Sequence, residues 1–329
     1  MSKKHIIIVH GRHLKPSFED KKRMVKKAIS HGLNRLDDKR AYQDFQNGDV
    51  KFTLVYYGDI NNKLMLQDDN KYEKELTNED LKYGTPCEDA AKFDIPLERL
   101  FEQKKHTESA YENHIDKVSD NRGFDEIASV VSWFSNLTGL SEKIIENATP
   151  DMGAYLMRHK VGSEVRERLQ KPLKKAILAG DDICLLAHSM GCIVSYDVLW
   201  KFSQMSEYRK IMKKNNPVTN WITIGNPLGE AGVRKNLYDA NEFYDGRYHR
   251  GIVKNWLNIS AVDDFVAHDS TIKDDFKEMK KNNYVNSIRD IKNLYNFWVG
   301  DSGDANPHKL YGYLDNPVMA KQLASWING

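Results

Sequence analysis

The sequence predicts an α/β fold, with a mostly parallel, twisted sheet and helices on both of its faces. Short apolar, β-branched runs alternate along the chain with segments whose apolar residues recur at helical spacing, as in successive β-α-β units. The first run, 5–11 (HIIIVHG), is almost wholly apolar, which is typical of a strand buried on both faces. Ligands of such sheets bind at the carboxyl ends of the strands, so we expect functional residues where predicted strands end.

The first β-α-β unit is expected at the start of the chain. Its strands are the run at 5–11 and a second run at 51–59 (KFTLVYYGD). Between them, Val25, Ala28 and Ile29 fall on one face of a predicted helix. That face would pack against the sheet.

The next segment, 61–150, is expected to be a helical cap inserted into a single domain that spans 1–329. From Asn61 to Asn121 the sequence is polar and rich in lysine, and it contains no strong strand. The stretch 122–140 then places apolar side chains along one helical face: Phe124, Ile127, Val131, Phe134 and Leu137. Such a helix either packs on its own domain or forms a lid over a site, and both interpretations stay open.

The alternation of strands and helices resumes after a helical stretch at 153–179. Further strands are expected at 183–189, 220–227, 254–262 and within 284–298. Further helices are expected at 190–204, 269–281 and 316–327. Pro317 suits the first turn of the last helix, because the N–H that proline lacks would be unpaired there.

Composition and charge limit the class of protein. The 329 residues carry 49 basic and 47 acidic side chains, a net charge of +2, which disfavours a general nucleic-acid binder. No stretch approaches the ~18 consecutive apolar residues of a transmembrane helix, and the apolar run near the N-terminus is too short for a signal peptide. Cys87, Cys184 and Cys192 lack the paired spacing of metal ligands. We therefore expect a soluble, cytoplasmic protein.

One serine stands at the junction between a predicted strand and a predicted helix. In LLAHSMGC (185–192), Ser189 has a small residue two positions before it, Ala187, and another two positions after it, Gly191. A nucleophilic serine in a strained strand–turn–helix needs small residues there, because the strand and the helix crowd the turn. The N–H of Met190 would be suited to stabilise an oxyanion. The alternative interpretation is a serine that only caps the helix.

A serine nucleophile needs a base to take its proton and an acid to orient that base. Asp263 and Asp264 follow the strand predicted at 254–262, and His308 lies in a loop between the last predicted strand and the last helix. We favour Asp264 over Asp263, because Asp264 precedes an apolar pair that would dock the loop. The order Ser189, Asp264, His308 is the chain order of nucleophile, acid and base in one fold in particular.

The loop after the first strand could supply a second donor for an oxyanion. Gly11 lies just beyond the strand, so an N–H of Gly11 or Arg12 could turn towards the serine. The Arg12 side chain either steers an anionic head group or is an ordinary surface arginine. His10 is expected to brace this loop, and His188, which precedes the serine, is expected to be structural.

Several other histidines are expected to take no part in catalysis. Four of them lie in polar contexts and should face solvent: His106, His114, His159 and His249. His268 is placed at the rim of the site or on the surface. A metal-dependent hydrolase is a further alternative, because HGRH (10–13) and the group Asp263, Asp264, His268 and Asp269 contain metal-ligand types. No H-E-x-x-H pair accompanies them, so no metal site is predicted.

The segments IIIVHG, LLAHSMG, DDFVAH and PHKLYGYLDNP, in that order and at those spacings, resemble the α/β-hydrolase superfamily. The similarity is closest to its bacterial lipase and serine-esterase branches, including relatives of the GPI-inositol deacylases. It covers residues 1–60 and 150–329. Two features depart from the family pattern: Ala187 replaces the first glycine of the serine turn, and the chain begins at the family's third strand.

The resemblance implies a serine hydrolase that cleaves carboxylic esters. Ser189 would be the nucleophile, Asp264 the orienting acid and His308 the general base. The substrate would be a small-molecule or lipid ester, with an apolar acyl part if the stretch 122–140 roofs the site, and no metal or organic cofactor is implied. The alternatives are a thioesterase or amidase on the same triad, and a non-catalytic binding protein with this fold.

Overall fold

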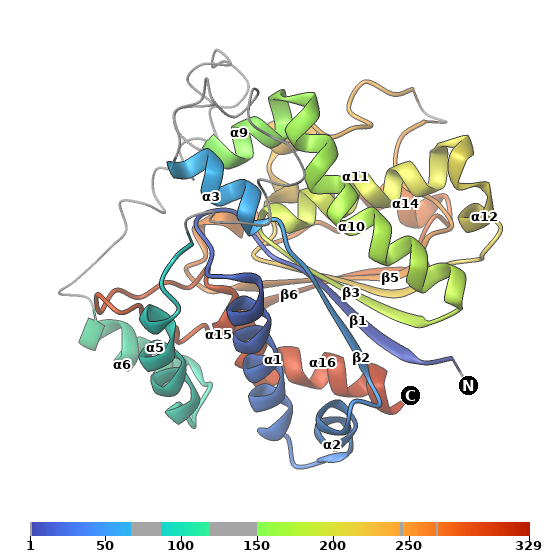
Figure 1. The fold of residues 1–329 in the computed structure, drawn as a ribbon. Coiled ribbons are helices and arrows are strands. Elements are labelled where there is room, and N and C mark those ends of the chain that lie inside the picture. The colour runs from blue at the N-terminus through green and yellow to red at the C-terminus, as the bar shows by residue number, and fades with distance from the viewer. Residues whose placement is uncertain (1, 67–86, 119–149, 244–245, 268) are drawn as a thin grey trace.

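The computed structural model describes residues 2–66, 87–118, 150–243, 246–267 and 269–329. Within them, six strands form one sheet, all parallel, in the order β2-β1-β3-β4-β5-β6 (Figure 1). The strands are β1 (Lys4–Val9), β2 (Lys51–Val55), β3 (Asp182–His188), β4 (Val218–Ile224), β5 (Val253–Ala261) and β6 (Ser287–Leu294). Helices flank this sheet on both faces, so the expected α/β fold with a parallel sheet is confirmed.

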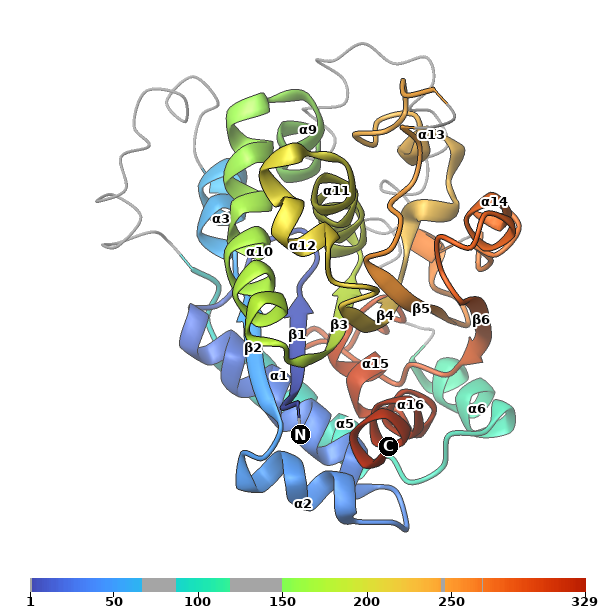
Figure 2. The same cartoon turned by 90° about the vertical axis from the view of Figure 1, so that its right-hand side faces the viewer.

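Two helical layers enclose the sheet, one above and one below it in Figure 1, and Figure 2 shows them after a turn of 90°. One layer contains α3 (Gly58–Leu66), α9 (Pro150–Met157), α10 (His159–Ala179), α11 (Met190–Gln204), α12 (Arg209–Met212), α13 (Ala231–Arg234) and α14 (Lys277–Lys281). The other contains α1 (Phe18–Asn34), α2 (Arg40–Asn47), α5 (Ala91–Glu102), α6 (Glu108–Val118), α15 (Leu310–Asp315) and α16 (Pro317–Asn328). None of the described helices combines the length and the apolar character that crossing a membrane requires.

The side chains of β1 pack alternately into two hydrophobic cores. Ile7 and Val9 pack into the core under α10 and α11, whereas Ile6 and Ile8 pack into the core under α1 and α16. All four side chains are fully buried. Because successive side chains of a strand point to opposite faces, a strand between two helical layers must be apolar at every position.

Some element boundaries differ from those expected. The run at 51–59 is a strand only as far as Val55, and Gly58 already begins α3. The helix α2 lies where no element is predicted. Pro317 does occupy the first turn of α16, and the preceding Asn316 caps that helix by accepting the Val318 N–H at 2.8 Å.

The helix predicted at 269–281 is wrong over its first half, because α14 begins only at Lys277. Asp269 Oδ1 accepts hydrogen bonds from the Thr271 N–H at 3.1 Å and from the Thr271 hydroxyl at 3.0 Å. The Asp290 carboxylate, on β6, accepts the N–H groups of the next two residues. These side-chain acceptors take the N–H groups that a helix would use, and they hold the segment in an irregular conformation.

The described part of the segment 61–150 packs beside the sheet. Phe93, Leu97 and Leu100 of α5 are buried in the same core as α1 and α15. Residues 67–86 and 119–149 lie outside the described residues, and they include the whole apolar stretch 122–140. The expectation of a lid over the site therefore stays a prediction.

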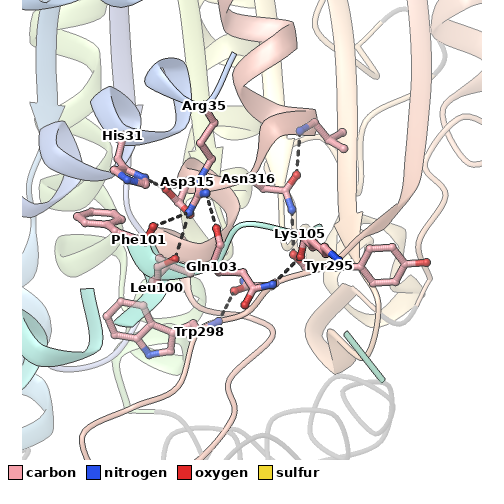
Figure 3. A network of polar contacts seen from close by, with 12 residues as sticks. His31, Arg35, Leu100, Phe101, Gln103, Lys105, Tyr295, Trp298, Asp315 and Asn316 are labelled. Atoms are coloured by element: carbon pink, nitrogen blue, oxygen red, sulfur yellow. Dashed lines mark hydrogen bonds and ion pairs between the residues drawn. The ribbon is translucent and has the colours of Figure 1, made fainter. Parts of the chain in front are cut away.

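A buried carboxylate joins three helices of one layer (Figure 3). Asp315, at the end of α15, is fully buried and accepts hydrogen bonds from His31 Nδ1 at 2.5 Å and from Arg35 Nη2 at 2.7 Å. Arg35 follows α1 and also donates to the carbonyl groups of Leu100 and Gln103, at the end of α5. This network fixes the position of α15, the helix that follows His308.

Removal of this carboxylate should destabilise the fold strongly. We expect Asp315→Ala to lower the free energy of unfolding by about 3 kcal/mol, because it leaves the largely buried Arg35 guanidinium, 12% exposed, without its counter-charge. Urea denaturation at pH 7 measures the change. The matched control is Glu167→Ala, which removes a solvent-exposed pair with Lys171 on α10 and should cost far less. An equal loss of unfolding free energy in both variants would contradict a strong stabilisation by Asp315.

Candidate active site

The sheet brings the ends of β1 and β3 side by side. β1 pairs with β2 on one edge and with β3 on the other, so the strand order reverses at β1. Such a reversal creates a crevice at the carboxyl ends of the strands, where α/β proteins bind ligands. Gly11 follows β1 and Ser189 follows β3, so both of these predicted site residues lie there.

Ser189 alone forms the turn between β3 and α11. Its backbone has φ 56° and ψ −128°, a region that residues other than glycine rarely adopt. Two hydrogen bonds hold this conformation: the Ser189 N–H donates to the Ile224 carbonyl at 3.1 Å, and its carbonyl accepts the Cys192 N–H at 2.8 Å. The turn thus has the strained strand–turn–helix geometry expected from the sequence.

The glycines around Ser189 allow the backbone to pack tightly. A Cβ atom at Gly191 would lie 2.7 Å from the carbonyl oxygens of both Val9 and His10, so the first turn of α11 rests directly on the end of β1. A Cβ atom at Gly11 would lie 2.7 Å from Ser189 Cβ and 3.2 Å from Ser189 Oγ. No side chain fits at either position without a shift of the backbone or of the serine itself.

Ala187, the departure from the family pattern, is accommodated by the core. It pairs with Val9 of β1 and Thr223 of β4, and it is fully buried in the core under α10 and α11. Its methyl group therefore contributes to packing, and it lies on the strand before the turn.

Asp264 and His308, which are 44 positions apart in the chain, are hydrogen-bonded. His308 Nδ1 lies 2.9 Å from both carboxylate oxygens of Asp264. The carboxylate also accepts the Tyr313 hydroxyl at 2.6 Å and the Val266 N–H at 3.0 Å. Asp263, the alternative acid, is exposed. The structure thus brings Asp264 to His308, and it leaves the second ring nitrogen, Nε2, for other contacts.

The carboxylate of Asp264 is held in its charged form. Burial opposes its ionisation, but the charge interaction with His308 and the hydrogen bonds from His308, Tyr313 and the Ala267 N–H outweigh burial and lower its pKa below the ordinary value. An ionised carboxylate at Nδ1 orients the imidazole and would stabilise it in its protonated form.

Two side chains fix the backbone of the His308 loop from either side. His188 Nε2 bonds to the His308 carbonyl at 2.7 Å, and its ring packs on the His308 ring with centroids 4.7 Å apart. Asn296 Nδ2 donates to the carbonyl groups of Pro307 at 2.6 Å and Lys309 at 2.9 Å. His188 thus contacts both the backbone and the ring of His308, whereas Asn296 has no distinctive signal in the sequence.

Gly225 is a functional position that the sequence reasoning missed. It follows β4 with φ +51°, and a Cβ atom there would lie 2.8 Å from two atoms of the His308 ring and 3.1 Å from Asp264 Oδ2. The residue must be small for the imidazole and the carboxylate to lie where they do. The available signal was a glycine within the strand predicted at 220–227, because a glycine in a predicted strand often marks a close approach of other groups to the backbone.

His10 braces the loop after β1, as expected. It is fully buried, and burial, with a smaller contribution from Lys15, lowers its pKa well below the ordinary value. The neutral ring accepts the Tyr57 N–H at Nε2 (3.1 Å), so Nδ1 is the nitrogen that donates to the Gly11 carbonyl (2.7 Å). This bond fixes the peptide group that joins Gly11 to Arg12.

The Arg12 side chain is not an ordinary surface arginine. Its Nε donates to Asp151 Oδ1 at 3.2 Å, and the Asp151 carboxylate is fully buried. The His13 N–H donates to the other oxygen of Asp151 at 2.5 Å. Asp151 therefore anchors the loop after β1 to α9.

A cavity of about 630 Å³ connects these parts. Ser189, His308 and Gly11 all line it, and the side chains of Val266 and Leu310 form apolar parts of its wall. Ser189 Oγ is buried and forms no hydrogen bond to any described residue. A buried hydroxyl without a partner is costly for folding, and such groups occur where a ligand or a reaction uses them.

The histidines expected to face solvent differ among themselves. His159 is exposed, but His106 and His114 are half-buried and pack against Phe297 with ring centroids 5.3 and 5.1 Å apart. His249 is fully buried among aromatic rings, and burial lowers its pKa to about 3. The prediction for His249 is wrong because its polar neighbours in sequence do not reveal the aromatic core that it packs into.

Among the described residues, no three His, Cys, Asp or Glu side chains are arranged to hold a metal ion. His268, one of the ligand types noted in the sequence, lies outside those residues.

Comparison of the chain with family models, with curated proteins and with solved structures finds no match. A functional conclusion therefore depends on the geometry of the site itself.

The ionised state of Asp264 should appear in the pH dependence of stability. Asp264→Asn should lower the free energy of unfolding by about 1.5–3 kcal/mol at pH 7, because hydrogen bonds to a charged acceptor are lost. A folded-state pKa below the ordinary value stabilises the protein above about pH 4, and this stabilisation is lost as the pH falls through the folded-state pKa. The difference between wild type and variant in urea denaturation should therefore shrink from pH 6 to pH 3. A difference that does not change over this range would contradict an ionised Asp264.

Proposed function

We propose that the protein is a serine hydrolase that cleaves carboxylic esters through an acyl-serine intermediate, and that it belongs to the α/β-hydrolase superfamily. One observation carries the proposal: a serine in a strained turn lines the same cavity as a histidine whose Nδ1 is hydrogen-bonded to a buried carboxylate. These are the nucleophile, base and orienting acid that acyl transfer needs.

In the proposed reaction, His308 Nε2 accepts the proton of Ser189 as its Oγ attacks the carbonyl carbon of the ester. The protonated His308, stabilised by Asp264, then donates this proton to the leaving alcohol as the bond from carbon to the alcohol oxygen breaks. Water activated by His308 adds to the acyl-serine, and the acid is released while Ser189 regains its proton.

The oxyanion of each tetrahedral intermediate needs two donors. The Met190 N–H belongs to the first turn of α11, where N–H groups have no partner within the helix, and it follows Ser189 directly. The second donor would be an N–H of Gly11 or Arg12, on the loop that His10 and Asp151 fix. Thioesters and amides could react on the same groups, and the choice among them depends on the leaving group.

A fluorophosphonate probe tests the nucleophile. We expect the wild type to be labelled covalently and Ser189→Ala to remain unlabelled, with p-nitrophenyl ester turnover reduced about 10⁴-fold or more. The control is Ser203→Ala, which removes another buried hydroxyl from α11 away from the cavity and should be labelled like the wild type. A folded wild type that is neither labelled nor active would favour a non-catalytic binding protein.

Gly225 provides a test of the position of His308. Gly225→Ala should reduce ester turnover about 10²-fold, because the new methyl group displaces the imidazole or the carboxylate. The matched control is Gly251→Ala, which also has positive φ (+65°) but whose Cβ atom would meet nothing within 4 Å. Both variants carry the same kind of backbone strain, so only Gly225→Ala should lose turnover beyond any loss of folded protein measured by circular dichroism. Equal turnover in the two variants would contradict this placement.

A further inference from the structure

The cavity that contains Ser189 and His308 has a strongly basic wall. Among the described residues that line it, Glu88 is the single carboxylate, whereas five carry a cationic group: Arg12, Lys15, Lys21, Lys92 and Lys309. Arg12 is already neutralised by Asp151. Two of the four lysines, Lys15 and Lys21, are buried.

Lys15 is buried without a carboxylate partner. Its side chain is among the buried ones, 8% exposed, and Nζ donates to the carbonyl groups of Arg12, His13 (2.9 Å) and Leu14 (3.1 Å), in its own loop. No ion pair of the described residues includes Lys15. Its ammonium group thus has neutral oxygens around it and the cavity beside it.

Lys21 is buried more deeply, in the first turn of α1. It is 4% exposed, and its one hydrogen bond among the described residues goes to the Tyr311 hydroxyl at 2.9 Å, with Nζ 4.3 Å from the centre of the Tyr311 ring. A cation is disfavoured at this end of a helix, where the helix dipole is positive. The position thus adds to the cost of burying Lys21.

We propose, on the basis of the hydrolase function above, that the substrate carries an anionic group, a carboxylate or a phosphate, which binds to Lys15, Lys21 and Lys309 at this wall. Lys309 follows His308, and its Nζ lies over the Phe93 ring at 4.8 Å, so it places a third cation at the cavity. Buried cations are stabilised by a paired anion, and no carboxylate of the described residues forms an ion pair with Lys15 or Lys21.

The acid–base properties of the two buried lysines support this proposal. Burial, with a smaller contribution from Lys309, lowers the pKa of Lys15 to about 7. Burial and the nearby Lys15 also lower the pKa of Lys21 well below its ordinary value. Both shifts express the cost of positive charge in the free cavity, which an anionic ligand would offset.

The test uses a neutral ester, p-nitrophenyl butyrate, and anions added at constant ionic strength with chloride as the balancing ion. Inorganic phosphate or acetate should raise KM and leave kcat unchanged, because the anion occupies part of the substrate site. Stronger inhibition by phosphate identifies a phosphate-bearing substrate, and stronger inhibition by acetate a carboxylate. Acetamide, which is neutral and matches acetate in shape, should not inhibit.

Lysine variants test whether the inhibiting anion binds at the basic wall. Lys21→Met should raise the inhibition constant of the effective anion about tenfold or more, because a charge-assisted hydrogen bond is lost. Lys309→Met tests the same wall at a half-buried position. The matched control is Lys201→Met on α11, where burial also lowers the lysine pKa but the side chain lies outside the cavity; it should keep the wild-type inhibition constant.

The results separate this proposal from the proposed hydrolase function. The proposal is overturned if Ser189 reacts with the fluorophosphonate while neither anion raises KM, or if the anions inhibit all three lysine variants equally. In both cases the hydrolase function would stand. Absence of labelling and of ester turnover in the folded wild type would instead reject the hydrolase function.

Discussion

The candidate site depends on one close approach, that of the first turn of α11 to the end of β1. Gly191 lies against the carbonyl groups of Val9 and His10, and this contact leaves no room for a side chain. The approach forces the whole reversal from strand to helix into Ser189, which therefore adopts positive φ. It also brings the loop after β1 against the serine, so one packing constraint places the hydroxyl and a candidate oxyanion loop together.

The ionisable groups of the candidate site include a buried anion, two neutral histidines and several lysines. Asp264 is the buried anion beside His308, and it is satisfied by hydrogen bonds from Tyr313 and from backbone N–H groups. His10 and His188 are kept neutral by burial, so they brace the backbone without adding charge. The lysines line the same cavity. An ester with an anionic substituent would thus place its carbonyl group near His308 and its charge against Lys15 and Lys21.

The parts of this arrangement that sequence could predict are local or follow strand order. The apolar run of β1 and the small residues around Ser189 each reflect a constraint that acts within a few residues of chain. The pairing of His308 with an acid after β5 followed from the chain order of serine, acid and histidine, and only the choice between Asp263 and Asp264 needed the fold. At Asp263, φ is +61° and the side chain is exposed, while the next residue turns inward.

The parts that sequence could not predict depend on contacts between distant segments. Gly225 is constrained by His308, which lies 83 positions later in the chain (308 − 225). Asn296 binds carbonyl groups that any residue would present, so nothing in its neighbourhood distinguishes it from a surface amide. His249 illustrates the opposite error, because polar neighbours in the chain hid an aromatic environment that Tyr196 of α11 and Trp221 of β4 provide.

The way the His308 loop is anchored determines which part of the cavity can adjust to a substrate. Asn296 and His188 clamp the loop before α15, and the Asp315 network clamps the far end of that short helix. His308 therefore lies on a loop that is anchored at both ends. The loop after β1 is held in turn by His10 and Asp151. Under the proposed function, differences in ester selectivity would therefore arise at α5, which lines the same cavity with Lys92 and Phe93.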